Sequence, residues 1–587
     1  MTDSFRTLPG LLKFAERNFR NDCALGYKKA GQWEKISTDA MGETVRRLCL
    51  GLVEMGLKPG EKVGIVADPS PFWIMMDMAI LGAGAVSVPM FANISPENLK
   101  YEIQDSGMRF LFVGSVGQYQ AMKPFFDRLE KIIVLPSGLE DNQCISYERL
   151  LETGERRQAT HGGEYSRLSE GINEQDTATI IYTSGSTGVP KGVELTHRNL
   201  VFEVLAAAKR FPLDPAHDTI LSCLPLAHVF ERLVCYFYLS TGVSIYFAEE
   251  IKKVGENLRE LHPTVITMVP RLLEKVHARM QTNVEMAQGL KKKLGSAAWE
   301  RAHSKELGSK DTFRDQLYDA LVYKKMREAL GGNLRLVISG SAPLDPNLGR
   351  FLLNIGIPIY EGYGLTESSP VISCNFIGHR KIGTVGLAFP GVEVKVGDDG
   401  EILTRGPHVM KGYYNHPKET AEVIDKLGWL HTGDLGHIDA EGYIKITGRK
   451  KELFKTANGK YVAPVPIEQA LAGNKLVDLV MVVAEAKPFT TCLLFPDFEN
   501  IDAVKKELDC LDMPTSAFLD APQARAYVQK TLDEVNAKLN HWEQVQKFTL
   551  IKTPISIESN ELTPSMKIRR HVVMEKYRKE IELMYKA

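Results

Sequence analysis

The chain has 587 residues, which is too long for one hydrophobic core and predicts two or more domains. Hydrophobic residues make up 44% and charged residues 25%, an ordinary composition for a globular protein. The net charge of -1 argues against a protein that binds nucleic acid through many phosphate contacts. The eight cysteines include no C-x-x-C pair, which favours a reduced, cytosolic chain without a structural zinc site.

The N-terminal segment shows no basic region followed by an apolar core, so we expect no cleaved signal peptide. The longest apolar run, residues 72–92, contains Asp77 and a glycine break near residues 82–84. This pattern is typical of a buried helix followed by a strand rather than of a membrane span. It leaves peripheral membrane contact open.

Residues up to about 59 carry a helical pattern, at 11–19 and 40–55. From residue 62 onwards, short apolar strands alternate with helices. This alternation predicts a parallel sheet that helices cover on both faces. The predicted strands are 63–67, 85–89, 109–113 and 176–182, and the predicted helices are 73–81 and 96–104.

A similar order recurs after residue 218, and we interpret it as a weak internal repeat that two stacked, doubly wound sheets would explain. Residues 278–330 are charged and helical, which indicates a solvated insertion between two strands. The predicted elements of this second series are strands at 219–225, 243–248 and 264–270 and helices at 232–239 and 256–261.

The last part of the chain has a glycine-rich β pattern up to about residue 443, with hairpin turn signals at 398–400 and 439–442. The composition changes after residue 448, and strands and helices alternate again. We therefore predict an α/β fold. A large N-terminal domain of two doubly wound sheets plus a β-rich subdomain covers residues 1–448, and a small α+β domain covers 449–587, with the boundary at about 449–451.

The stretch YTSGSTGVPKG, residues 182–192, lies between a predicted strand and a helix that Thr196 can cap. Its glycines and hydroxyl residues favour neither helix nor strand, so we expect a loop. Backbone N–H groups, hydroxyls and the charge of Lys191 suit an anion with several oxygens. The order after Gly188 does not match G-x-x-x-x-G-K-[ST]. We predict a phosphate-binding loop of another kind, with a solvated Gly/Ser linker as the alternative.

Five motifs follow one another along the chain: YTSGSTGVPKG at 182–192, EGYGLTE at 361–367, HTGD at 431–434, ITGRKKELFKTANGK at 446–460 and LTPSMKIRR at 562–570. In order and spacing they resemble the adenylate-forming superfamily of acyl-CoA synthetases, adenylation domains and luciferases. The resemblance covers nearly the whole chain. It implies an enzyme that uses ATP and Mg²⁺.

The resemblance also implies roles for single residues. Tyr363 would stack on adenine from a glycine-flanked turn, in which Gly362 and Gly364 leave space for the ligand, and residues 340–342 would form the opposite wall. Thr366 would hydrogen-bond the α-phosphate, and Glu367 would hold Mg²⁺. On residue type alone, Tyr363 could equally be a core tyrosine and Glu367 a solvated glutamate. The implied ATP-binding residues are Thr183, Ser184, Gly185, Ser186, Thr187, Gly188, Lys191, Gly340, Ser341, Ala342, Tyr363, Gly364, Asp434 and Arg449.

Asp434 would accept hydrogen bonds from the ribose hydroxyls, and Arg449 would reach the ribose or a phosphate. Lys567 matches a family lysine that contacts the substrate carboxylate and the α-phosphate, where a cation offsets the charge that builds during attack. Residue type alone favours a surface lysine. Because Lys567 must leave before a thiol arrives, the resemblance implies that the small domain is mobile and rotates about Lys451. Gly459 is then a candidate contact for CoA.

LPLAHVFER at 224–232, VPRLLEKVHARM at 269–280 and the charged insertion are similar to the long-chain fatty acyl-CoA synthetase branch. This branch implies fatty acid, ATP and CoA as substrates and acyl-AMP as the intermediate. His228 would border the acyl carboxylate, with a structural histidine as the alternative. The sequence departs from the branch at Glu452, where aspartate is commoner, and at Arg232, where some members carry an aromatic gate.

Two alternatives remain at this point. An acyl-acyl carrier protein ligase or a fatty acyl-AMP ligase would not use free CoA, and a silent acyl- or nucleotide-binding protein would catalyse nothing. Retention of Glu367, Arg449 and Lys567 argues against the silent protein. We expect a cytoplasmic enzyme without a nucleic-acid partner, and peripheral contact at the inner membrane face stays open. The sequence fixes neither the oligomeric state nor the acyl chain length.

Overall fold

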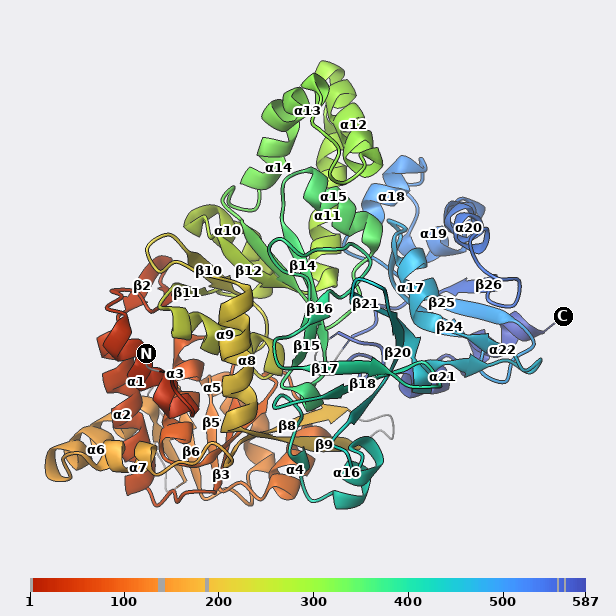
Figure 1. Cartoon of the computed structure of the whole chain (residues 1–587). Helices are drawn as coiled ribbons and strands as arrows, with labels where there is room; N and C mark the ends of the chain where they lie inside the picture. The colour runs from red at the N-terminus through yellow and green to blue at the C-terminus, as the bar shows by residue number, and fades with distance from the viewer. Residues whose placement is uncertain (1–3, 136–142, 185–188, 557–558, 564–565, 587) are drawn as a thin grey trace. The chain divides into compact units, whose positions relative to one another are not determined.

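The computed structural model describes residues 4–135, 143–184, 189–556, 559–563 and 566–586 (Figure 1). The chain divides into two compact units. The larger unit consists of residues 1–395, 403–432 and 438–445, and the smaller unit of residues 396–402, 433–437 and 446–587. The predicted α/β class is confirmed. The domain boundary at residues 448/449 and the hinge at 449–451 stay predictions.

The first predicted βα series forms an eight-stranded sheet in the larger unit. Its strands are β3 (Lys62–Val66), β4 (Val86–Met90), β5 (Phe110–Val113), β6 (Lys131–Val134), β7 (Cys144–Ser146), β8 (Thr177–Ser184), β9 (Pro190–Thr196) and β19 (Gly412–Tyr413). They lie in the order β19-β9-β8-β4-β3-β5-β6-β7. The strands from β8 to β7 are parallel, while β9 and β19 are antiparallel additions at one edge.

The apolar run at 72–92 forms a buried helix followed by a buried strand, as predicted. Helix α3 (Pro71–Gly82) begins after Ser70, whose side chain accepts a hydrogen bond from the Trp73 N–H. Almost every residue of α3 is buried, Asp77 included. Among the described residues, no helix combines the length and the apolar character needed to cross a membrane. The other helices of this series are α2 (Thr38–Glu54), α4 (Pro96–Ser106), α5 (Val116–Met122), α6 (Tyr147–Thr160) and α7 (Glu164–Glu170).

The second series forms a nine-stranded sheet, so the predicted pair of doubly wound sheets is confirmed. Its strands are β1 (Leu25–Lys29), β2 (Gln32–Ile36), β10 (Thr219–Ser222), β11 (Ser244–Phe247), β12 (Val265–Met268), β13 (Leu336–Ser339), β14 (Ile359–Gly364), β15 (Val371–Cys374) and β16 (Leu387–Ala388). The order is β16-β15-β14-β13-β12-β10-β11-β1-β2. The strands from β14 to β1 are parallel, and both edges are antiparallel.

The helices predicted at 11–19 and 40–55 form as α1 (Leu8–Asn18) and α2 (Thr38–Glu54), and the hairpin β1–β2 between them was not predicted. Ala30 and Gly31 have φ values of 49° and 81°, which form a tight turn between the two strands. Leu25 of β1 pairs with Ile245 of β11, more than 200 residues away. The hairpin therefore forms because the edge of a distant sheet accepts it, which local patterning does not reveal.

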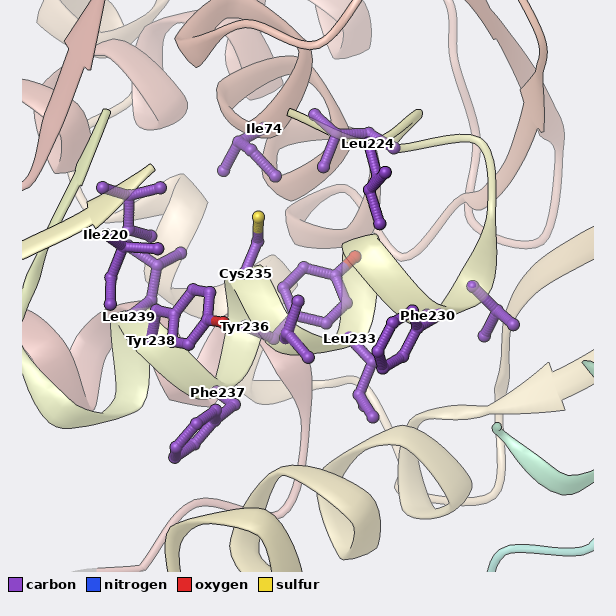
Figure 2. Close-up of a cluster of buried hydrophobic side chains, with 14 of the residues drawn as sticks. Ile74, Ile220, Leu224, Phe230, Leu233, Cys235, Tyr236, Phe237, Tyr238 and Leu239 are labelled. Carbon is purple, nitrogen blue, oxygen red and sulfur yellow. The ribbon is translucent and has the colours of Figure 1, made fainter. Parts of the chain in front are cut away.

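Helices α8 (His197–Arg210), α9 (Val229–Thr241), α10 (Val254–Leu261) and α15 (Pro346–Asn354) belong to the second series. Thr196 caps α8 through a capping box with Asn199, as predicted. Helix α9 is buried nearly all round, and its apolar side chains belong to the cluster in Figure 2, together with Ile74 of α3, Ile220 of β10 and Leu224. The labelled members are Ile74, Ile220, Leu224, Phe230, Leu233, Cys235, Tyr236, Phe237, Tyr238 and Leu239.

The predicted charged insertion is helical, as expected. It consists of α11 (Pro270–Met286), α12 (Gly289–Ser304), α13 (Phe313–Tyr318), the π-turn η3 (Asp319–Tyr323) and α14 (Lys324–Glu328). The last three elements run on without a break, and η3 packs against α12.

The predicted hairpins form two turns of a four-stranded sheet. Gly400, with φ 82°, follows β17 (Glu393–Val396) and precedes β18 (Glu401–Arg405). Gly442, with φ 87°, lies between β20 (Leu430–Ile438) and β21 (Ile444–Arg449). The division between the two units passes through these four strands.

The smaller unit contains a three-stranded sheet of β24 (Val477–Val483), β25 (Thr490–Pro496) and β26 (Val545–Leu550). Alternate residues of β24 face two different hydrophobic clusters: Val480 and Val482 belong to one, and Met481 and Val483 to the other. Both faces are therefore covered by apolar side chains. The main helices are α17 (Pro464–Ala472), α18 (Ile501–Glu507), α19 (Thr515–Asp520), α20 (Pro522–Asn536), α21 (Arg570–Lys576) and α22 (Arg578–Tyr585).

Candidate active site

The ends of two neighbouring parallel strands, β13 and β14, form the first part of the site. Ser339 pairs with Glu361, so the segments that follow leave the sheet side by side. A Cβ atom on Gly340 would lie 3.6 Å from the carbonyl oxygen of Gly362. Ser341 has a φ of 68°, a left-handed conformation that costs a non-glycine residue energy and often marks a functional turn. The structure thus brings together the two segments that the sequence assigns to adenine.

Glu361 fixes this turn to the sheet. Its carboxylate accepts a hydrogen bond from the Leu344 N–H at 3.2 Å. The side chain is buried, and this burial raises the pKa of Glu361 to about 7. Sequence reasoning assigned no role to Glu361, since a glutamate before two glycines carries no local signal of burial.

Tyr363 lies on β14, so the prediction that it sits in a turn is wrong. It pairs with Ser373 of β15, and its side chain is only half-buried. A Cβ atom on Gly364 would lie 1.7 Å from the carbonyl oxygen of Pro370. Glycine is therefore required at 364 because β15 approaches closely, and the space that we expected there for a ligand is filled by backbone. At Gly362 the nearest atom would be 3.6 Å away, an ordinary contact.

Tyr413 connects two predicted site residues. Its hydroxyl donates a hydrogen bond to Glu367 Oε1 at 2.9 Å. Lys191 Nζ lies 5.2 Å from the centre of the same ring, within the range of a cation–π contact. Tyr413 is in this position because β19 pairs with β9, which places it opposite Val193. The structure thus gathers Lys191 and Glu367 around one aromatic side chain.

Burial, followed by the negative charge of Glu367, raises the pKa of Tyr413 well above its ordinary value. Tyr413 therefore stays a neutral hydrogen-bond donor at physiological pH. Sequence reasoning missed it because its two partners precede it in the chain by 46 residues and by more than 200 residues. The preceding Gly412, in a β pattern, was the only local signal.

The predicted phosphate loop lies between two paired antiparallel strands, β8 and β9, and includes their ends. Strand β8 extends to Ser184 and β9 begins at Pro190, so residues 182–184 and 190–192 are strand rather than loop. Thr183 pairs with Lys191, which places both at the mouth of the turn. Tyr182, one residue earlier, donates a hydrogen bond from its hydroxyl to Asp105 at 2.7 Å and so anchors β8. The predicted ligand residues Gly185, Ser186, Thr187 and Gly188 lie outside the described residues.

His228 is the N-cap of α9. Its Nδ1 accepts a hydrogen bond from the Phe230 N–H at 3.2 Å, and the side chain is half-buried. A Cβ atom on Gly340 would lie 3.4 Å from the Phe230 ring. The start of α9 therefore borders the turn at 340–342. His228 has a structural role as a cap, and its predicted contact with the acyl carboxylate stays a prediction.

Arg232 does not line an acyl channel in this structure. It is fully buried, and its guanidinium donates to Asp77 at 2.6 and 3.1 Å and to Thr179 at 2.7 Å. Tyr236 donates to the same aspartate. Arg232 thus ties α9 to α3 and β8, and its side chain lies in the core.

In the smaller unit, Arg449 and Asp434 form an ion pair of 2.8 Å. Asp434 lies on β20 and Arg449 ends β21. Lys567 lies near enough to both to sense their charges. The pKa of Lys567 is lowered, first by desolvation and then by the like charge of Arg449. The side chain is nevertheless exposed on the surface of the smaller unit. The three predicted polar groups of this unit therefore lie together.

Two further predicted residues of the smaller unit, Gly459 and Lys451, lie in short turns. Gly459 has a φ of 74°, and no atom lies within 4 Å of the position of a Cβ. Its N–H donates to the Thr456 carbonyl at 2.9 Å, which closes a turn. The turn requires glycine, whatever approaches it. Lys451 lies in a single helical turn, η5 (Lys450–Glu452), and its role as a hinge stays a prediction.

Among the described residues, no group of three or more His, Cys, Asp or Glu side chains could hold a metal ion. Mg²⁺ does not need such a group, because one carboxylate, phosphate oxygens and water complete its shell. Glu367 is half-buried, and one of its oxygens already accepts from Tyr413. The remaining oxygen suits this role.

Comparison with known proteins places these residues in context. A model of the AMP-binding enzyme family matches residues 13–414, and a model of the AMP-binding enzyme C-terminal domain matches residues 452–587. The long-chain-fatty-acid–CoA ligase FadD15 of Mycobacterium bovis is 34% identical and covers 94% of this chain and 93% of its own. The peroxisomal long chain acyl-CoA synthetase 6 of Arabidopsis thaliana is 31% identical and covers 99% and 86%.

Solved structures share the fold at lower identity. The adenylation domain of a carboxylate reductase from Mycobacterium chelonae superposes with a TM-score of 0.76 at 21% identity and covers 99% of this chain and 91% of its own. ATP-bound MatB from Rhodopseudomonas palustris superposes with a TM-score of 0.71 at 22% identity and covers 99% and 100%. With family models that match most of the chain and full-length relatives above 30% identity, the chain belongs to the family of AMP-binding enzymes.

Proposed function

We propose that the protein is an AMP-forming long-chain fatty acid:CoA ligase. The substrate class rests on relatives of that name in bacteria, plants and human, which match the chain over 94–99% of its length. The observation that carries the adenylation chemistry is the group around Tyr413. It combines a cation at Lys191 with a carboxylate at Glu367 at one site in the larger unit. A nucleoside triphosphate with its metal ion needs this combination of charges.

We assign adenine to the half-buried ring of Tyr363 and to the turn at 340–342, which the strand register brings beside it. Thr366 follows in the same segment and is assigned to the α-phosphate. Lys191, at the mouth of the hairpin, is assigned to the β- and γ-phosphates. Mg²⁺, when bound at Glu367, supplies positive charge to the phosphate oxygens.

The first half-reaction joins the acyl group to AMP. An oxygen of the fatty carboxylate bonds to the α-phosphorus, and the bond from that phosphorus to the departing pyrophosphate breaks. We assign Lys567 to the carboxylate and α-phosphate oxygens, where its charge offsets the negative charge that builds during attack. Asp434 and Arg449, which lie near it, are assigned to the ribose.

The second half-reaction forms the thioester. The sulfur of CoA, after loss of its proton, bonds to the acyl carbon, and AMP leaves with the electron pair of the acyl–oxygen bond. We propose that Lys567 withdraws for this step by rotation at Lys451, and that CoA passes the open turn at Gly459, where a side chain would be in the way. We further propose that the reaction takes place in the cytoplasm, where ATP and CoA are supplied.

A panel of acids from decanoate to oleate, incubated with ATP, Mg²⁺ and CoA, tests the function. We expect acyl-CoA, AMP and pyrophosphate in equal amounts. Acyl-AMP that accumulates without an acyl-CoA product would indicate a fatty acyl-AMP ligase, and a thioester that forms only on a carrier protein would indicate a carrier-protein ligase. If no acid supports ATP–pyrophosphate exchange, the protein is a silent binding protein and the proposal fails.

A further inference from the structure

The outer face of the helical insertion carries an apolar stripe. Phe313, Leu317 and Leu321 are 80%, 41% and 46% exposed and follow one another at four-residue intervals along α13 and η3. This spacing places them on one side of the helical segment. Three large apolar side chains in a row on a surface helix differ from the scattered exposed residues of an ordinary surface.

The opposite face of the same segment is firmly packed, so the stripe is not the result of a loosely placed helix. Asp315 is buried and accepts two hydrogen bonds from the Arg301 guanidinium, at 2.7 and 2.9 Å. The Tyr323 hydroxyl donates to the Ala298 carbonyl at 2.7 Å. Met326 is buried as well. The inward face thus fixes which residues point outward.

Basic side chains surround the stripe. Between residues 305 and 328, four exposed cations form no ion pair among the described residues: Lys310, Arg314, Lys324 and Lys325. By contrast, three acidic groups of the stretch are neutralised, because Asp311 pairs with Lys305, Asp315 with Arg301 and Asp319 with Arg327. Glu306 and Glu328 remain, so the surface around the stripe has a surplus of positive charge.

We propose that this surface, Phe313, Leu317 and Leu321 with the four surrounding cations, docks the protein on an anionic phospholipid bilayer. Apolar side chains on one helical face enter the boundary between headgroups and acyl chains, and lysine and arginine side chains attract anionic headgroups. Anionic headgroups complement the surplus of positive charge around the stripe. An anionic bilayer therefore fits this surface better than a neutral apolar partner does. Docking would bring the enzyme to the phase into which long-chain fatty acids partition, a benefit that rests on the proposed function.

Sedimentation of the full chain with phospholipid vesicles tests the proposal. The protein binds vesicles that contain phosphatidylglycerol and binds vesicles of phosphatidylcholine alone far less. The variant F313S/L317S loses about tenfold or more in partitioning to anionic vesicles, because the apolar anchor is gone. The variant K324E/K325E loses about tenfold or more, and its residual binding no longer falls with added salt. Vesicle binding is measured without ATP and CoA, so it is independent of the proposed activity.

Two further variants serve as controls. L427S removes a leucine that is 71% exposed outside the stripe and leaves vesicle binding unchanged. M286S/L290S alters a second exposed apolar pair, which precedes three lysines at the turn between α11 and α12, and keeps at least half of the binding. The melting temperature and the turnover of dissolved decanoate stay at the wild-type values in all four variants.

Three outcomes would overturn the proposal: equal binding to neutral and anionic vesicles, wild-type binding by F313S/L317S, or loss of binding in M286S/L290S alone. A fourth is a dimer in size-exclusion chromatography that F313S/L317S abolishes, because the stripe would then be covered by a second copy of the chain.

Discussion

Two arginine–aspartate pairs in this protein have the same chemistry and opposite surroundings. Arg232 and Asp77 are 1% and 0% exposed and lie in the core of the larger unit. Arg449 is 53% exposed and pairs with Asp434, which is 4% exposed, in the smaller unit. The Arg232 guanidinium also donates a hydrogen bond to Thr179 and is shielded from solvent. The second guanidinium is more than half exposed, so water or a ligand can reach it.

The first pair is part of the core, and the second is the pair to which we assign a role in binding the ribose. A buried pair contributes little net free energy, yet either partner alone is costly because its charge has no solvent. An exposed guanidinium loses little when its partner is removed and can exchange that partner for a ribose or phosphate oxygen. The contrast therefore predicts that variants of the first pair affect stability and that variants of the second affect substrate binding.

The largest expected effect is on Asp77. Replacing it with alanine leaves the Arg232 guanidinium buried without a counter-charge, which should lower the free energy of unfolding by about 3–5 kcal/mol. Urea unfolding of the larger unit, followed by circular dichroism, measures this loss. The matched control is the double variant Asp77→Leu with Arg232→Met, which removes both charges and should recover most of the stability. Equal losses in the single and double variants would show that packing, not charge, is what matters there.

The next effect concerns catalysis rather than stability. Lys567→Ala should slow ATP–pyrophosphate exchange by about 100- to 1,000-fold, because a cation aimed at the developing charge is lost. Thioester formation from supplied acyl-AMP and CoA should stay close to wild type, since we assign Lys567 to the first half-reaction alone. The control is Lys576→Ala, which removes a lysine on α21 that pairs with Glu561. It should alter neither step. Equal loss of both half-reactions in Lys567→Ala would contradict the assigned role.

The buried carboxyl group of Glu231 is a third case, in which a hydroxyl group rather than an arginine is the hydrogen-bond partner. Glu231 is fully buried beside Ser222, which donates to it at 2.5 Å, and burial raises its pKa to about 7. The folded protein therefore holds this proton above the pH at which the unfolded chain releases it. Stability from this group is present below about pH 4.5 and is lost as the pH rises towards 7.

Glu231→Gln cannot titrate, so its free energy of unfolding should fall less than that of the wild type between pH 5 and pH 8, by at most about 3 kcal/mol. Chemical unfolding at several pH values gives both curves. Parallel curves would mean that Glu231 keeps an ordinary pKa.

The smallest expected effect on stability is at the exposed pair. Arg449→Ala should lower the free energy of unfolding by less than Asp77→Ala does, because the guanidinium that it removes is largely solvated, although the Asp434 carboxylate that it leaves is buried. The same variant should raise KM for ATP about tenfold, since a charged hydrogen bond to the nucleotide is lost. Arg405→Ala, which removes an exposed arginine paired with Glu393, is the matched control and should leave KM unchanged. A stability loss in Arg449→Ala as large as that in Asp77→Ala would end the distinction between the two pairs.

Local patterning predicted most elements of the two large sheets and the hairpin turns correctly, because short β-branched runs, capped helices and turn residues carry their own signals. The cap at Thr196 and the hairpin turns at 398–400 and 439–442 are examples. The hairpin β1–β2 was missed, since its strands are stabilised by β11 rather than by their own residues. The site shows the same limit: the motifs locate Lys191 and Glu367, but Tyr413 between them is found only in three dimensions.

The sequence by itself determined the family, the order of the elements and the residues that the motifs contain, because these depend on residue types at short spacings. Only the tertiary structure decided which charged residue belongs to the core and which to a site. Arg232 and Arg449 look alike in sequence, and the strands and helices around each one set its burial. Burial in turn sets the cost of an unpaired charge, and contacts across hundreds of residues decide it.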